Sequence, residues 1–334
     1  MNTPRISVLL PCFNDGQWID EALDSVRQQT FQDFEIVVVD DGSTDAATVR
    51  KLESIDDSNI RVFRTENRGL PAARNHAAAQ ARGELFCALD ADDRLAATWF
   101  EKGQALLTSR PEITFVSHWL ETFGDEHWTW KPERCDLPAL LVKNTINGAA
   151  LVRRAAFQAV GGYDESMRHG CEDWDFWLRL VEAGHQGTII PEVLFYYRRH
   201  STSMSRGMIT PAGYPAPLET LLDKHAPAFR DHLATVIVSR ENDRLSLGRE
   251  IAALERDRLT VLEPGLERAA EELRALHAKE TRVRAQQLAR EERDRLAHQV
   301  NQLQTEVSSL RTSWSWRITG PLRWVYSRLM GVRP

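Results

Sequence analysis

The chain has few cysteines, no long hydrophobic run and no excess of positive charge, although it is 334 residues long. Its four cysteines are far apart and form no CxxC pair, so neither a zinc site nor a disulfide framework is indicated. No apolar segment approaches the length of a membrane span, and residues 1–5 contain no signal core, so we expect a cytoplasmic protein. The net charge of −6 argues against general nucleic-acid binding.

Short apolar runs alternate with amphipathic stretches over residues 5 to about 200. The runs are β-branched or continuously apolar, as strands buried on both faces should be. This order predicts an α/β domain with a mostly parallel sheet and right-handed crossovers. The expected strands are 6–10, 35–39, 60–64 and 84–89, and the expected helices are 18–29, 46–54, 71–81 and 174–181.

Polar clusters follow three of the expected strands, at 14–15, 40–41 and 90–93. Ligands of parallel sheets bind outside the carboxyl ends of the strands, so these clusters are predicted to converge on one rim. No GxGxxG motif follows the first strand, and a dinucleotide site therefore lacks its defining motif. Crowded carboxylates repel one another unless a cation lies between them, and a divalent cation stabilises a leaving diphosphate. The pattern indicates sugar transfer from a nucleotide diphosphate.

Asp90 and Asp92 are alternate residues of an extended segment, so their side chains project to opposite sides. One is expected to bind the metal ion while the other reaches the ribose or the sugar. Asp93 is expected to cap a helix that begins near Leu95 or Ala96. The alternative is that all three aspartates form only a solvated cap and turn.

Three further groups are candidates for the chemistry. Arg68 and Arg74 flank a predicted helix start and would suit a phosphate, unless that helix is merely solvated. Glu172 and Asp173 open an apolar helix, where a carboxylate would take the proton of an attacking hydroxyl or would simply cap the helix. His200 follows a basic stretch and precedes a polar loop that would close over a diphosphate.

Residues 241–312 are rich in Glu, Arg, Ala, Leu and Gln, and their apolar residues have the a/d spacing of a coiled coil. The spaced residues are Leu247, Ile251 and Leu254, and later Leu296, Val300, Leu303, Val307 and Leu310. Glu-Pro-Gly at 263–265 interrupts the pattern, which leaves a bent helix, a helical hairpin and one long rod as alternatives. A helix of this length needs a partner helix, so we expect a homo-oligomer.

The tail at 313–334 interleaves Trp314, Trp316 and Trp324 with arginines and has no acidic residue. This pattern suits a helix lying in an anionic membrane interface, or tryptophans that pack against the rest of the protein. The expected organisation is a catalytic domain at 1–210, a helical linker at 211–240, a coiled coil at 241–312 and the basic, aromatic tail.

Taken in order, several short motifs resemble family 2 glycosyltransferases of the GT-A fold, the inverting enzymes that build bacterial surface polysaccharides. The resemblance covers residues 5 to about 205. It rests on SVLLPCFN at 7–14, VDDGSTD at 39–45, NRGLPAARN at 67–75, LDADD at 89–93, GGYD at 161–164 and EDWD at 172–175. It implies a Rossmann-like sheet with helices on both faces, a UDP-sugar as the favoured donor, and Mn²⁺ or Mg²⁺ as cofactor.

The resemblance also assigns roles to individual residues. Asp173 would be the general base, and Glu172 would help to orient the acceptor. The nucleoside pocket would be lined by Pro11, Phe13, Asp15 and Asp41, with Asp40 alongside. Asp90 and Asp92 would form the DxD pair, with Asp92 as metal ligand, and His200 would contact the metal or the diphosphate.

The tail is similar to one found on various bacterial polysaccharide enzymes, which places the protein at the inner membrane face beside a glycan or lipid-linked acceptor. Two other functions stay open. A nucleotidyltransferase that makes sugar nucleotides would want a Gly-rich N-terminal loop, whereas the first strand here runs into Pro-Cys-Phe-Asn. An inactive coiled-coil scaffold of a polysaccharide assembly complex is opposed by the intact Asp90, Asp92 and Asp173.

Overall fold

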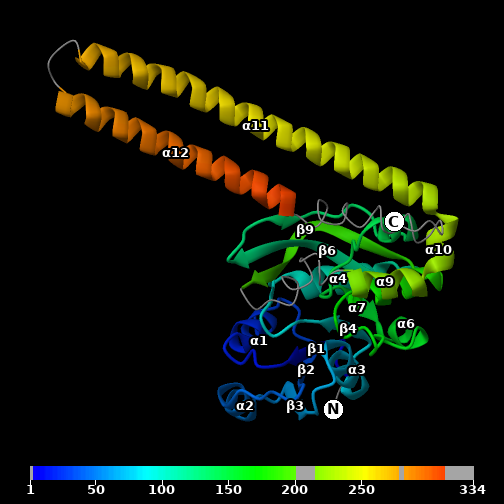
Figure 1. Cartoon of the computed structure of the whole chain (residues 1–334). Coiled ribbons are helices and arrows are strands. Elements are labelled where there is room, and N and C mark those ends of the chain that lie inside the picture. The colour runs from blue at the N-terminus through cyan, green and yellow to red at the C-terminus, as the bar shows by residue number, and fades with distance from the viewer. Residues whose placement is uncertain (1–2, 201–214, 278–281, 313–334) are drawn as a thin grey trace. The chain divides into compact units, whose positions relative to one another are not determined.

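The computed structural model describes residues 3–200, 215–277 and 282–312. The chain divides into two compact units between His232 and Leu233. Each unit has its own architecture (Figure 1).

The first unit is built on one mixed sheet. Its strands are β1 (Ile6–Cys12), β2 (Phe34–Asp40), β3 (Ile60–Arg64), β4 (Leu85–Ala88), β5 (Arg94–Leu95), β6 (Phe115–Gly124), β7 (Thr129–Trp130), β8 (Leu151–Arg153) and β9 (Gly187–Arg199). In the described part of the chain the order is β3-β2-β1-β4-β8-β6-β9-β5, with β7 paired to β6. The first four of these neighbours are parallel, as predicted, whereas β8 is antiparallel to both β4 and β6.

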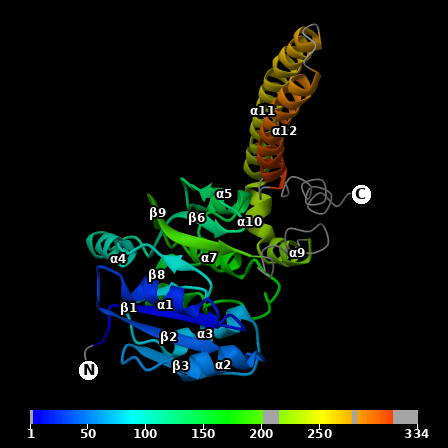
Figure 2. The same ribbon diagram turned by 90° about the vertical axis from the view of Figure 1, so that its left-hand side faces the viewer.

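Helices cover both faces of this sheet (Figure 2). They are α1 (Ile19–Arg27), α2 (Ala46–Glu53), α3 (Leu70–Gln80), α4 (Trp99–Ser109), α5 (Leu137–Val142), α6 (Arg154–Ala159), α7 (Glu172–Glu182), α9 (Pro215–Lys224) and α10 (Ala226–Asp231). The buried side of α1 shares a core with Val8 and Leu10 of β1. On the opposite face, α3 contacts β1 and β2 through small residues such as Ala73 and Ala77, which allow close approach. The α/β class is confirmed, and a strand or helix is present at each range expected between residues 6 and 89 and at 174–181. The helix expected to begin near Leu95 or Ala96 is not, because Arg94 and Leu95 form β5.

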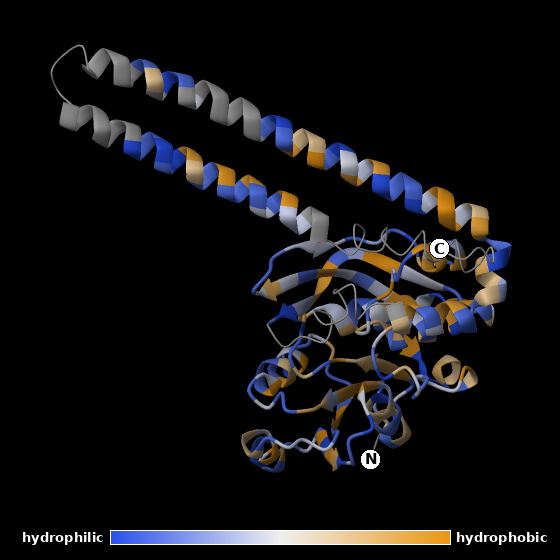
Figure 3. Ribbon diagram, viewed as in Figure 1, coloured by the Kyte–Doolittle hydropathy of each residue, from blue (hydrophilic) through white to orange (hydrophobic). Residues whose placement is uncertain are grey.

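The continuous burial of β1 and β2 explains why the sequence signal was strong there. All seven residues of each strand are buried, as expected for strands covered on both faces. Figure 3 shows these strands as mainly apolar. The longest pairing is less obvious from sequence: β6 and β9 run parallel over ten residue pairs, with irregularities around Trp119. Because β9 also pairs with β5, its end lies beside the segment that follows β4.

The second unit is a helical hairpin formed by α11 (Leu233–His277) and α12 (Arg282–Thr312), which lie side by side in Figures 1 and 2. The partner helix expected from the sequence is therefore present within the same chain. Of the three alternatives left open by the sequence, the helical hairpin is the one observed. The interruption at 263–265 affects the apolar spacing and does not end a helix, because α11 continues through it. Gly265 is instead a close-packing position: a Cβ there would come within 2.7 Å of the Leu296 Cδ1 atom.

The hairpin buries only part of its apolar spacing. Leu247, Ile251 and Leu296 are buried, whereas Val300 and Leu303 are half-buried. In the part of the chain that the structure describes, no helix is both long enough and apolar enough to cross a membrane. Helices α9 and α10 lie within the range expected as a linker, and they belong to the first unit. The basic, aromatic tail at 313–334 lies outside the described residues.

Candidate active site

The carboxyl ends of β1, β2 and β4 meet at one edge of the sheet, because these three strands are parallel neighbours. This brings together the polar clusters that follow them. Pro11 is buried within β1. Phe13, just after this strand, is 43% exposed. An exposed aromatic ring at the ligand edge of a parallel sheet is available to stack on a flat group such as a nucleobase.

Asp40 and Asp41 brace the loops at this edge. One carboxylate oxygen of Asp41 accepts a hydrogen bond from the backbone N–H of Arg68 (2.9 Å), and the other accepts from Gly69 (2.8 Å). Asp40 Oδ1 accepts from the backbone N–H of Ser43 (2.8 Å). Both aspartates are buried, so these bonds offset the cost of removing a carboxylate from water.

Arg68 and Arg74 have different surroundings, although the sequence predicts the same role for both. The guanidinium of Arg68 is exposed and pairs with Glu165 at 2.5 Å. Arg74 is buried, and its guanidinium donates to both carboxylate oxygens of Asp90, at 2.8 and 3.0 Å. It also donates to Glu172 Oε1 at 2.9 Å. The structure therefore brings Arg74, but not the guanidinium of Arg68, to the turn that contains Asp90, Asp92 and Asp93 (residues 90–93, the aspartate turn).

Arg74 joins the segment after β4 to the start of α7. Because its side chain is buried, the alternative that Arg74 merely lies on a solvated helix is excluded. A bidentate arginine–carboxylate pair sets orientation as well as charge. Burial raises the pKa of Glu172 to about 7, although the positive charge of Arg74 opposes this shift. The buried cluster therefore carries one cation between two carboxyl groups.

Asp92 lies on the other side of the turn, against His200. The distance from its Oδ2 to His200 Nε2 is 2.9 Å, and the His200 ring stacks on Trp18 with centroids 6.1 Å apart. Burial and the charge of Asp90 raise the pKa of Asp92, against the influence of His200. Burial and the charge of Asp92 likewise raise the pKa of Asp15 to about 6. On this side of the site, burial and the neighbouring carboxylates therefore both disfavour the ionised forms of Asp15 and Asp92.

The donors at this turn fit a divalent cation that is completed by other ligands. Within residues 3–200, 215–277 and 282–312, no group of three or more His, Cys, Asp or Glu side chains is arranged to hold a metal by itself. Asp92 and His200 supply one oxygen and one nitrogen donor, a combination open to Mn²⁺, and Mg²⁺ commonly relies on one or two carboxylates plus phosphate and water. Burial and then repulsion from neighbouring carboxylates raise the pKa values of Asp15 and Asp92, and a bound cation would offset that repulsion.

Asp93 does not cap a helix, which corrects the prediction. Residues 94 and 95 form β5, and the next helix, α4, begins only at Trp99. The buried Asp93 carboxylate accepts a hydrogen bond from the backbone N–H of Arg198 at 2.7 Å. This partner is 105 residues away in the chain, and it is therefore invisible to a local pattern.

Arg198 belongs to the basic stretch that precedes His200 in the sequence, but its contacts show a role that the sequence did not indicate: it holds the aspartate turn in place. Its Nε donates to the carbonyl oxygen of Asp92 at 2.8 Å, and its guanidinium pairs with Glu21 at 2.7 Å. The guanidinium carbon lies 4.0 Å from the ring centroid of Trp18 and 4.3 Å from that of Phe123. Two aromatic rings and three polar contacts thus anchor the end of β9 next to the turn.

Asp173 lies in the first turn of α7, next to Glu172. Its Oδ1 accepts a hydrogen bond from the backbone N–H of Trp174 (2.7 Å), and its Oδ2 accepts from Asn144 Nδ2 (3.1 Å). Burial raises the pKa of Asp173, while the charge of Arg74 opposes the shift. Glu172 pairs with Arg74, so its carboxylate does more than cap the helix. A carboxyl group with a raised pKa beside a fixed cation is suited to accepting a proton.

The far side of α7 is tied to α9 and α10 by a second charged cluster. Asp175 is fully buried, and its Oδ1 lies 2.6 Å from Lys224 Nζ and 3.1 Å from His225 Nε2. The other ring nitrogen of His225 is 2.8 Å from Glu182. Burial opposes protonation of His225, but the hydrogen bonds to the two carboxylates raise its pKa. No motif in the sequence singled out these two basic residues.

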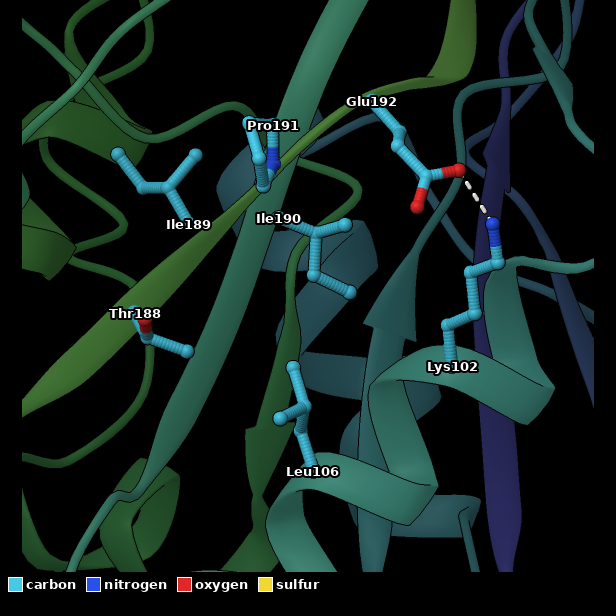
Figure 4. Close-up of a pocket in the computed structure, with 7 residues that line it drawn as sticks. All are labelled: Lys102, Leu106, Thr188, Ile189, Ile190, Pro191 and Glu192. Atoms are coloured by element: carbon cyan, nitrogen blue, oxygen red, sulfur yellow. Dashed lines mark hydrogen bonds and ion pairs between the residues drawn. The ribbon is translucent and has the colours of Figure 1, made fainter.

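A separate hollow of about 440 Å³ lies between α4 and the first half of β9. Figure 4 shows Lys102 and Leu106 of α4 facing residues 188–192 of β9, with Lys102 paired to Glu192. His200 follows the opposite end of the same strand. This mainly apolar hollow therefore does not belong to the carboxylate site.

Comparison with known proteins agrees with this geometry. The sequence matches the family described as Glycosyl transferase family 2 over residues 7–164, and Glycosyltransferase like family 2 over residues 135–236. An uncharacterized glycosyltransferase of Haemophilus influenzae is 30% identical over 227 residues, which cover 61% of this chain and 68% of that protein. The putative glycosyltransferase EpsE of Bacillus subtilis is 26% identical over 216 residues, covering 62% of this chain and 77% of EpsE.

Among solved structures, TarS 1–349 of S. aureus in complex with UDP-GlcNAc is similar, with a TM-score of 0.57 and 20% identity over 70% of each chain. At this identity the similarity shows the fold. The mixed α/β sheet, the carboxylates at its edge and the match to the Haemophilus relative lead to one assignment. The chain belongs to glycosyltransferase family 2 and is a glycosyltransferase.

Proposed function

We propose that this enzyme moves a sugar from a UDP-sugar to a hydroxyl of a cell-surface glycan or a lipid-linked acceptor, with inversion at the anomeric carbon. The observation that carries the proposal is the Arg74 bridge. It connects Asp90, on the turn proposed to hold the donor, with Glu172, the neighbour of the proposed base. This bridge supports the proposal, because it would hold the donor side and the acceptor side of the reaction in one cluster.

Asp173 is the proposed general base. As the acceptor oxygen bonds to the anomeric carbon, its proton passes to the Asp173 carboxylate, and the bond from that carbon to the donor phosphate oxygen breaks. A single displacement of this kind inverts the anomeric configuration and leaves no sugar on the enzyme. Glu172, held by Arg74, is proposed to orient the acceptor. Because burial raises the pKa of Asp173, the base is poised to hold a proton during the reaction.

The donor is proposed to lie along the edge formed by β1, β2 and β4. Asp92 and His200 would hold Mn²⁺ or Mg²⁺, and a bound cation would supply stabilisation of the negative charge on the leaving diphosphate. Pro11, Phe13 and Asp15 would line the nucleoside side. Asp40 and Asp41 support that side through their bonds to neighbouring loops.

A UDP-sugar is favoured because the structurally similar TarS is described in complexes with UDP-GlcNAc and with UDP. A surface-glycan acceptor remains part of the proposal, as does contact of the tail at 313–334 with the inner membrane face. Homo-oligomer formation through the hairpin also remains a proposal. Because α11 and α12 already pair within one chain, the hairpin does not require a second copy, and light scattering tests whether one binds.

The first test is a thermal-shift series with UDP, GDP, dTDP and CMP, each with and without Mn²⁺. A ligand at about 100 times its dissociation constant adds about 2.7 kcal/mol of stability, which moves the melting temperature visibly. We expect a metal-dependent shift with UDP that is lost in Asp92→Ala. A shift with another nucleotide alone would contradict the UDP assignment, and metal-independent binding would contradict the proposed role of Asp92.

The base is tested by Asp173→Asn, which keeps the size of the side chain but removes its capacity to accept the proton. We expect this variant to bind the nucleotide as the native protein does and to lose transfer. Near-normal turnover would remove Asp173 from the base role. Loss of nucleotide binding together with turnover would instead indicate a structural defect.

A further inference from the structure

The segment after α5, residues 144–148, contacts the proposed base Asp173. No sequence motif identified this segment as part of the site. Asn144 at its start donates a hydrogen bond to Asp173 Oδ2 at 3.1 Å. Gly148 at its end lies against the cation of the cluster, since a Cβ there would be 3.6 Å from Arg74 Nη2. Both ends of the segment therefore reach the charged groups that join the turn to α7.

The orientation of the Asn144 amide follows from a second contact. Its Oδ1 accepts the backbone N–H of Ile146 at 3.2 Å, which leaves Nδ2 to face Asp173 as a donor. An amide flipped the other way would place an oxygen against a carboxylate and a donor against an N–H, and both contacts would be repulsive. The segment thus presents an N–H group, and not an acceptor, to Asp173.

The Asp173 carboxylate consequently has one donor on each oxygen. The backbone N–H of Trp174 binds Oδ1 at 2.7 Å, and Asn144 binds Oδ2. Two donors from different segments restrict rotation of the carboxyl plane. Each carboxylate oxygen has more than one lone-pair site, so a hydroxyl proton still finds an acceptor.

We propose that Asn144 is a positioning residue, which holds the carboxylate of Asp173 in the plane required to receive the proton of the acceptor hydroxyl. This inference rests on the proposed base role of Asp173. Productive proton transfer needs the base within hydrogen-bond reach and correctly directed, and a carboxylate free to rotate meets that condition only part of the time. Asn144 itself exchanges no proton.

The role has a measurable sign, because the Asn144 N–H favours the ionised form of Asp173. The other groups that bear on this carboxyl come from α3, from the segment after β4, from the loop before α7 and from α7 itself: Arg74, Asp90, Tyr163, Cys171 and Glu172. Arg74 favours the ionised form, whereas burial and Asp90 disfavour it. Removing the amide donor therefore raises the pKa of Asp173.

The experiment measures kcat/KM for UDP release from the donor as a function of pH in Asn144→Ala and Asn144→Asp. In Asn144→Ala the acid limb is expected to move upward by about one pH unit, a tenfold loss below the limb that corresponds to about 1.4 kcal/mol. Asn144→Asp preserves size but places a second carboxylate against Asp173, so its shift should be larger. The KM for the donor and the nucleotide-induced thermal shift should be unchanged. Asn301→Ala, on the exposed surface of α12, is the matched control.

The ranking of the two variants separates positioning from simple packing. A packing role predicts that the isosteric Asp is tolerated better than Ala and that activity falls equally at every pH. Either result would overturn the inference. If Asp173→Asn is inactive while the Asn144 variants leave the acid limb in place, only the positioning role fails. If Asp173→Asn remains active, the base role and this inference both fail.

Discussion

Each of the two units contains an arginine–glutamate ion pair, but the pair in the first unit is buried and the pair in the second is exposed. Arg74 and Glu172 in the first unit are 2.9 Å apart, and their side chains are only 4% and 9% exposed. Arg295 and Glu292 on α12 are 2.5 Å apart, with side chains 60% and 27% exposed. Losing one partner of a buried pair leaves an uncompensated charge in the interior, whereas an exposed pair is solvated in any case. Burial therefore decides how much free energy of unfolding is lost when one partner of the pair is removed.

Breaking the buried pair should produce the largest effect. Arg74→Met removes the cation and leaves Asp90 and Glu172 facing each other, so the free energy of unfolding should fall by about 3–5 kcal/mol. Urea unfolding of the first unit measures this loss. The matched variant Arg295→Met should leave the melting temperature unchanged. Similar losses in both variants would mean that burial does not separate the two pairs.

A substitution in the second unit tests the comparison there, because the hairpin is held together by a small number of buried apolar residues. Leu296 is buried against Gly265, and Leu296→Ala should destabilise the hairpin by about 2–3 kcal/mol. Far-UV circular dichroism follows the helical transition, and the half-buried Leu303→Ala should cost less. The nucleotide-induced thermal shift should be unaffected, since the hairpin is a separate compact unit. A reduced shift would show that the units are coupled.

The smallest expected effect is a pH dependence confined to the first unit. His225 bonds Asp175 and Glu182, and its raised folded pKa lies above the unfolded value of about 6.5. Its stabilisation is complete below the unfolded pKa and is lost as the pH rises through the folded pKa. Urea unfolding over a pH series should show this decline, and His225→Gln should remove it. The exposed His298→Gln in the hairpin should not, and an unchanged slope in His225→Gln would contradict the assignment.

Much of the fold was predictable where its signal is local. The apolar runs of β1 and β2 and the amphipathic pattern of α1 lie within single short windows, and the structure places these elements within one or two residues of the expected bounds. Elements defined by distant partners were not predictable in this way. The β6–β9 pairing depends on strands separated by several other elements. Gly265 interrupts the apolar spacing of the sequence, and a local pattern does not reveal that Leu296 packs against it.

The same distinction between local signals and distant partners applies to the candidate site. Carboxylates at strand ends were predictable, since a parallel sheet brings such ends together. The environments of Arg68 and Arg74 were not, because one is exposed and the other is enclosed by Glu172, which is 98 residues away. Asp93 had the local pattern of a helix cap, but a backbone N–H from β9 competed for its carboxylate. Asn144 belongs to no recognisable motif, and only its contact with Asp173 identifies it.

The two aspartates of the turn obtain their partners from very different distances along the chain. Asp90 is paired by Arg74, 16 residues before it, whereas Asp92 meets His200, 108 residues after it. Contacts that close long loops carry the larger entropic cost and slow folding. On the ribosome, Arg74 is therefore available to Asp90 soon after both are translated, and the partner of Asp92 emerges only after β9. A nascent chain that ends before His200 therefore has the Arg74–Asp90 pair but lacks the Asp92–His200 contact, so the two sides of the proposed donor site are completed at different stages of synthesis.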